Sequence, residues 1–153
     1  MFKYSMSGLD NVWLENGYTL TETPYGPAVH IEDPDGLDAA IAMSLVKKEG
    51  ALGGKEVKFI RQLLGLSQKD AGRFVGVDAQ TVARWEKGEC QIGGAADKMI
   101  RLCYLAHASG DTTVTAAIEA VNFMDRAANG KFILTRHAEP AEWESTQSEA
   151  IPA

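Results

Sequence analysis

The sequence predicts an α+β fold in which a small strand-rich N-terminal domain with one helix precedes an all-α domain. Two observations favour this class. Between residues 12 and 31, short aromatic and aliphatic runs alternate with turn residues, which is typical of strands. From residue 55 onward, apolar residues recur three and four positions apart, which is typical of helices. We therefore expect domains at 1–50 and 51–130, and a possible strand with a mobile acidic tail at 131–153.

The N-terminal domain contains several turn signals. Asn16-Gly17 separates two aromatic and aliphatic runs and predicts a hairpin that joins them, because both central residues of such a turn need a positive φ. TPYGP at 23–27 predicts a second turn before a strand at 28–31. DPDG at 33–36 closes a further turn, and the apolar spacing after it predicts an amphipathic helix over Leu37–Lys48.

The second domain is predicted to be a series of short helices. The small residues of Glu49–Gly54 indicate a hinge between the two domains. A helix begins at Lys55 and ends at Gly65, because glycine readily adopts the left-handed geometry that ends helices. Beyond the central pair of helices, apolar periodicity predicts a helix at about Ala95–His107 and an additional C-terminal helix at about Thr112–Asn129.

The central pair of helices has clear start and stop signals. Ser67 is the expected N-cap of the first helix, which Gly76 ends. Asp78 is the expected N-cap of the second helix, Ala79–Lys87. A small residue, Ala71, is expected where the two helices cross. Two short helices joined by a tight turn in this way form a helix-turn-helix.

The outer face of the second helix predicts DNA recognition. If Val82 and Trp85 turn inward, four side chains are left to read base edges: Ala79, Gln80, Thr81 and Arg84. Gln pairs with adenine and Arg with guanine in the major groove, and four-residue spacing places Gln80 and Arg84 on one face. The expected phosphate contacts are Gln68, Lys69 and Lys87. A helix-turn-helix that serves only for packing remains the alternative.

The charge distribution agrees with a local DNA-binding surface. The net charge of −6 argues against indiscriminate coating of nucleic acid or anionic lipid. Residues 55–104, however, hold nine basic and six acidic side chains, whereas the segments on either side are acidic. The sequence lacks an apolar run that would indicate a signal peptide or a membrane span, so we expect a cytoplasmic protein.

LSQKDAGRFVGVDAQTVARWEKG resembles the helix-turn-helix of the lambda-repressor-like, XRE-type transcriptional regulators. The resemblance implies that Lys55–Leu105 is most or all of that module. It also implies that Gln68 contacts a phosphate and that Ala79, Gln80 and Arg84 face base edges. A further implication is a structural ion pair between Arg61 and Glu86.

The layout also resembles MqsA-type antitoxins, which place a small zinc-binding domain ahead of this module. The N-terminal block contains no cysteine, and Ser5 and Ser7 stand where a cysteine pair would be expected, so no metal is predicted. No nucleophile, base and orienting group occur at a recognisable spacing, and no phosphate-binding glycine loop is present. We therefore predict neither an enzyme nor a cofactor.

The sequence predicts a DNA-binding transcriptional regulator, a repressor that reads a palindromic operator through helix 79–87. Its partners are double-stranded DNA and a second copy of the chain, held by Val114–Met124 or by the N-terminal strands. The alternative is a protein-binding antitoxin or adaptor that neutralises a basic toxin through its N-terminal domain.

Overall fold

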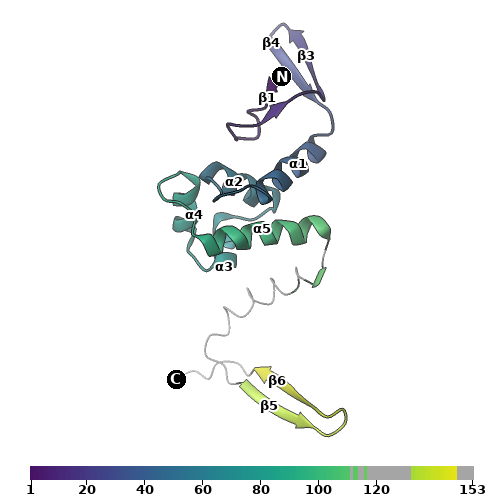
Figure 1. Ribbon diagram of the computed structural model, residues 1–153, viewed down its shortest axis with the longest axis vertical. Coiled ribbons are helices and arrows are strands. Elements are labelled where there is room, and N and C mark those ends of the chain that lie inside the picture. The colour runs from purple at the N-terminus through teal and green to yellow at the C-terminus, as the bar shows by residue number, and fades with distance from the viewer. Residues whose placement is uncertain (111, 114–115, 117–131, 148–153) are drawn as a thin grey trace. The chain divides into compact units, whose positions relative to one another are not determined.

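The computed structural model describes residues 1–110, 112–113, 116 and 132–147, and it confirms the α+β class (Figure 1). The chain divides into two compact units, Met1–Thr112 and Thr113–Ala153. The first unit holds strands β1 to β4 and helices α1 to α5, and the second holds β5 and β6. The predicted helix over Thr112–Asn129, with the Val114–Met124 dimer surface, falls almost entirely outside the described residues.

The four N-terminal strands form two separate antiparallel pairs. The strands are β1 (Phe2–Lys3), β2 (Trp13–Leu14), β3 (Tyr18–Thr23) and β4 (Gly26–Ile31). β1 pairs with β2, and β3 pairs with β4 around the predicted turn at Pro24-Tyr25. The hairpin predicted at Asn16-Gly17 is therefore wrong. Gly17 does adopt a positive φ, but its carbonyl accepts a hydrogen bond from Glu32 N and so extends the β3–β4 ladder instead.

Helix α1 (Pro34–Val46) begins three residues before the predicted start at Leu37. DPDG is therefore a helix start and not only a turn. Asp33 is the N-cap, and its carboxylate accepts a hydrogen bond from Gly36 N. Pro34 follows at the first helical position, where its fixed φ suits a helix and its missing N–H costs nothing. The predicted helix is therefore confirmed, and only its start is wrong, because proline at the first helical position begins a helix as readily as it marks a turn.

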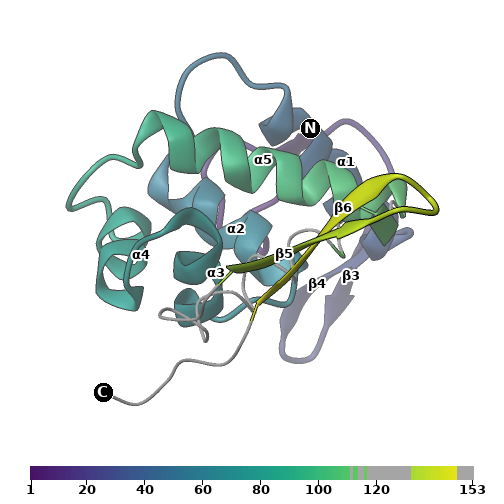
Figure 2. The ribbon, with the colours of Figure 1, turned by 90° about the horizontal axis from the view of Figure 1, so that it is seen from below.

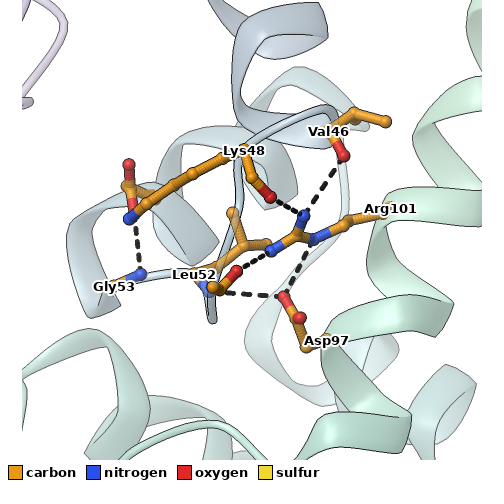
Figure 3. Close-up of polar contacts among 8 residues, drawn as sticks. Val46, Lys48, Leu52, Gly53, Asp97 and Arg101 are labelled. Atoms are coloured by element: carbon orange, nitrogen blue, oxygen red, sulfur yellow. Dashed lines mark hydrogen bonds and ion pairs between the residues drawn. The ribbon is translucent and has the colours of Figure 1, made fainter.

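The segment between α1 and α2, predicted to be a hinge, is held in place by α5 (Figure 3). Arg101 donates hydrogen bonds from Nη1 to the carbonyls of Val46 and Lys48, and from Nη2 to that of Gly50. Its Nε donates to Asp97 Oδ1 at 3.1 Å. Leu52 is buried within this segment. The Arg101 guanidinium thus satisfies backbone carbonyls at and just after the end of α1. Because Leu52 is also buried, the segment is packed and is not a free hinge.

The remaining helices of the first unit are α2 (Gly54–Leu63), α3 (Gln68–Val75), α4 (Ala79–Glu86) and α5 (Gly94–Ser109). The longest, α5, contacts α1, α2 and α3 (Figure 2). The largest fully buried side chains are Ile60, Val57 and Val82. The same apolar cluster includes Tyr4, Leu9 and Leu14 of the N-terminal block, so one core supports both the strands and the helices. The predicted division at residue 50 stays a prediction.

The second unit contains one hairpin within its described residues. β5 (Phe132–His137) pairs antiparallel with β6 (Glu142–Gln147). The sequence predicts one strand here and a patternless tail after it, but residues 142–147 form a second strand. Register explains the difference, because pairing places Trp143 beside Arg136 and Glu144 near His137, whose Nε2 lies 2.7 Å from Glu144 Oε2. These cross-strand pairs are not visible in the acidic sequence of β6 alone.

Candidate nucleic-acid interface

Two N-caps fix the start of each helix in the helix-turn-helix. Ser67 Oγ accepts a hydrogen bond from Asp70 N at 3.0 Å, and α3 ends at Gly76 in left-handed geometry. Asp78 Oδ1 accepts hydrogen bonds from Thr81 N at 2.8 Å and from Thr81 Oγ1 at 2.6 Å. Both caps and the terminal glycine are those that the sequence predicts. The turn between the helices is therefore fixed by local chemistry.

The close approach between α3 and the start of α4 occurs at Gly72 and not at Ala71. A Cβ added to Gly72 would lie 2.5 Å from the carbonyl oxygen of Val77, which no side chain would tolerate without a shift. Ala71 is also buried, but it lines a small apolar pocket together with Val57 and Ile100. The predicted crossing at Ala71 is therefore wrong by one residue. Ala71 faces the core, and Gly72 faces the turn.

Gly54 makes a second close contact, which its sequence context does not predict. A Cβ added there would lie 2.1 Å from the carbonyl oxygen of Trp85 and 2.9 Å from that of Glu86. The first residue of α2 therefore packs directly against the end of α4. In the sequence, the pair Gly53-Gly54 predicts a flexible segment. Its role here is to let two backbones approach.

The recognition helix α4 has a buried side and an exposed side. Val82 and Trp85 are 1% and 6% exposed, as the inward positions require. On the other side Gln80 and Arg84 are exposed, and Ala79 and Thr81 are half-buried. Lys87 is the C-cap residue and is exposed. The structure therefore leaves Gln80 and Arg84, one turn apart, open to solvent on the same helix.

Thr81 differs from the other three predicted base-reading residues. Its hydroxyl already donates to Asp78, so the oxygen can only accept a hydrogen bond from a base, and the methyl group is free to contact a thymine methyl. The Thr81 hydroxyl is also the main reason that the pKa of Asp78 is lowered, followed by the Thr81 backbone N–H, and the positive charge of Arg84 lowers it further. Asp78 is therefore held as a carboxylate at the start of α4. That charge stabilises a helix N-terminus but opposes a phosphate placed there.

The side chains predicted to contact phosphates lie at the two ends of the motif. Lys69 and Lys87 are exposed, and neither forms an ion pair within the described part of the chain. Gln68 is half-buried, and its Nε2 donates to Glu86 Oε1 at 3.4 Å. The amide of Gln68 is thus oriented by α4 before any DNA is present. The sequence does not reveal this contact, because it joins residues in two different helices.

The structure brings Arg61 and Glu86 together. Nε and Nη2 of Arg61 each donate to one carboxylate oxygen of Glu86 at 2.8 Å. Nη1 of Arg61 donates to the carbonyl of Leu66, just before the N-cap of α3. The side chains are 13% and 4% exposed. This bidentate pair fixes α2, the start of α3 and the end of α4 relative to one another.

Among the described residues, His, Cys, Asp and Glu side chains form no group of three or more that could hold a metal ion. Cys90 is exposed and Cys103 is buried, and both are free thiols. Burial raises the pKa of the Cys103 thiol. No helix within residues 1–110 or the other described positions is both long and apolar enough to cross a membrane.

A comparison with protein families identifies the same segment. Residues 57–92 match the family described as Helix-turn-helix, and the match runs from the first turn of α2 to the loop after α4. No curated protein and no solved structure matched the chain. The matched family comprises DNA-binding regulators and is typically not enzymatic. Residues 57–92 are therefore a helix-turn-helix of the XRE type, a DNA-binding domain of transcriptional regulators.

Proposed function

We propose that this protein is a sequence-specific repressor that binds a palindromic operator as a homodimer. The observation that carries the proposal is the exposed pair Gln80 and Arg84 on a capped recognition helix. Gln and Arg are the side chains best suited to adenine and guanine in the major groove. Lys69 and Lys87 add positive charge at the two ends of the motif, where phosphates would lie on either side of that groove.

Dimerisation is part of the proposal because one short recognition helix gives too small a contact for tight binding. Helix-turn-helix proteins commonly solve this by placing two recognition helices in successive major grooves, about 34 Å apart. We propose the same arrangement here, with the operator formed by two inverted half-sites. The acidic segments on either side of the basic block would then limit nonspecific binding, since they repel the phosphates of DNA that offers no base contacts.

The test is binding to the DNA upstream of the protein's own reading frame, measured by fluorescence anisotropy with a scrambled duplex as competitor. We expect specific binding that weakens as salt rises, and a symmetric footprint about two half-sites. Arg84→Ala should weaken specific binding, whereas Lys47→Ala, which removes an exposed positive charge at the end of α1, should not. Equal affinity for the upstream and scrambled duplexes would contradict the proposal.

A second candidate function is that of an antitoxin or adaptor that binds a basic protein through its N-terminal domain. Its support is the composition of residues 1–38, which hold seven acidic side chains and a single basic one, Lys3. Such a surface favours encounter with a positively charged partner. Co-expression with the product of an adjacent small basic reading frame, followed by co-purification, tests this candidate.

A further inference from the structure

A groove lies between the segment that ends in β2 and one side of α1. It has a volume of about 320 Å³, and its apolar lining includes Val12, Trp13, Leu14, Leu37, Ile41 and Leu45. Leu14, Ile41 and Leu45 are buried and form its floor, whereas Trp13 is 56% exposed at its rim. We call it the Trp13 groove.

The chemistry of the lining indicates what kind of ligand fits. No charged side chain lines the Trp13 groove, and its polar side chains are those of Asn11 and Ser44. The Ser44 hydroxyl already donates to the Ala40 carbonyl at 3.0 Å, within α1. Small metabolites are usually held by several converging polar groups, which this groove lacks. Its size and lining suit one or two large apolar side chains of another protein.

Trp13 has the properties of an interface anchor. Its indole is largely exposed, and Lys3 on the neighbouring strand places its Nζ 5.8 Å from the ring centroid. An exposed Trp beside an apolar depression is typical of a binding hot spot.

The charges next to the groove are mostly negative, but Lys3, whose Nζ lies over the Trp13 ring, is a positive charge beside it. Asp10 and Glu15 flank the Asn11–Leu14 segment, and Asp38 follows Leu37 on α1. Asp10 pairs with Lys55 at 2.8 Å, but neither Glu15 nor Asp38 forms an ion pair among the described residues. Burial raises the pKa of Asp38, and the Asp35 carboxylate raises it further. Glu15 and Asp38 thus leave the rim with a net negative charge, although Lys55 and Lys3 offset part of it.

We propose that the Trp13 groove is the docking site for a basic protein partner, which inserts one or two apolar side chains and places Lys or Arg side chains at the acidic rim. This inference rests on the second candidate function and names its surface. Charge complementarity selects the occupant, because a basic segment would place its Lys or Arg side chains near Glu15 and Asp38, which form no ion pair among the described residues.

The test uses a phage-displayed library of random peptides, about 12 residues long, selected on the immobilised full chain. We expect the enriched peptides to combine large apolar residues with Lys or Arg. Their affinity for the soluble protein should fall at least about tenfold in Trp13→Ala and in Ala40→Glu, which places a charged side chain in the groove. The matched control is Ala39→Glu, since Ala39 is exposed on the same helix but does not line the groove.

Three outcomes would overturn the inference. The first is no enrichment, or enrichment of acidic peptides. The second is equal binding of the enriched peptides to the wild type, Ala40→Glu and Ala39→Glu. The third is a change of oligomeric state in Ala40→Glu by sedimentation, which would make a second copy of the chain the occupant. Operator binding, measured on the same variants, separates this inference from the repressor proposal, because both alanines belong to α1 and lie outside α4 and outside the matched segment.

Discussion

The carboxylate of Glu86 at the end of α4 accepts two hydrogen bonds at 2.8 Å from the guanidinium of Arg61 in α2. The same carboxylate accepts a weaker one from Gln68, which begins α3. Glu86 therefore links α4 to both α2 and α3, which pack against it. Because both charges are largely buried, the pair is costly to break on one side only.

We predict that Arg61→Ala destabilises the protein by about 3–5 kcal/mol, because it leaves the Glu86 charge buried without its partner. The double variant Arg61→Met with Glu86→Leu should recover most of that loss, since it removes both charges and fills the space with apolar groups. Urea unfolding followed by circular dichroism measures both. A double variant no more stable than Arg61→Ala would show that the pair contributes through its geometry rather than through the cost of an unpaired charge.

Gly72→Ala should also destabilise the fold, by about 1–3 kcal/mol, since the added methyl group would overlap the Val77 carbonyl. The matched control is Gly94→Ala at the first position of α5, where nothing lies within 4 Å of the added Cβ and φ is not positive. That change should be neutral or stabilising by up to about 1 kcal/mol. Equal melting temperatures for the two variants would argue against a close approach at Gly72.

The helix-turn-helix was predictable because its signals are local. Ser67, Gly76 and Asp78 each act on backbone groups within a few residues of themselves, so their roles can be inferred from sequence. Features that depend on distant segments were missed or misassigned. The partner of β2 is β1 and not β3, and the β5–β6 register pairs residues that show no pattern in either strand.

The predicted hinge at Glu49–Gly54 failed for a related reason. Glycine indicates either freedom or close packing, and the sequence alone does not distinguish the two. In this fold Gly54 abuts the Trp85 carbonyl, and Arg101, about fifty residues away in sequence, binds the carbonyl of Gly50. Long-range partners of this kind decide whether a glycine-rich segment is a linker or part of the core.

The Asp78 cap should make the stability of the fold depend on pH in the acid range. The lowered pKa of Asp78 means that its contribution is complete above the ordinary aspartate pKa, about 3.9, and is lost as pH falls through the lowered value. Asp78→Asn keeps an acceptor for the Thr81 N–H but does not titrate. The difference in melting temperature between wild type and Asp78→Asn should therefore shrink on acidification. A difference that is constant from pH 7 to about pH 2 would contradict this prediction.

Arg101→Lys should loosen the segment between α1 and α2. Lysine keeps the positive charge but not the planar fork that reaches Val46, Lys48 and Gly50 at once. Lys47 and Lys48 are exposed trypsin sites in this segment. We expect faster trypsin cleavage after these residues under native conditions, whereas Arg73→Lys, an exposed change on α3, should leave the rate unchanged. Cleavage at the wild-type rate in Arg101→Lys would show that the charge alone holds the segment.

Arg84 and Lys87 should affect DNA binding in different ways. Arg84→Lys keeps the charge but loses the bidentate geometry that guanine requires, so specific binding should weaken by about 1–3 kcal/mol. Its salt dependence should change little. Lys87→Ala should instead weaken binding to specific and scrambled duplexes alike and reduce the salt slope by about one. Anisotropy titrations at several salt concentrations separate the two. If Arg84→Lys lowered the affinities for the specific and the scrambled duplex equally, Arg84 would be a phosphate contact. The bases would then be contacted by Gln80 and its neighbours on α4.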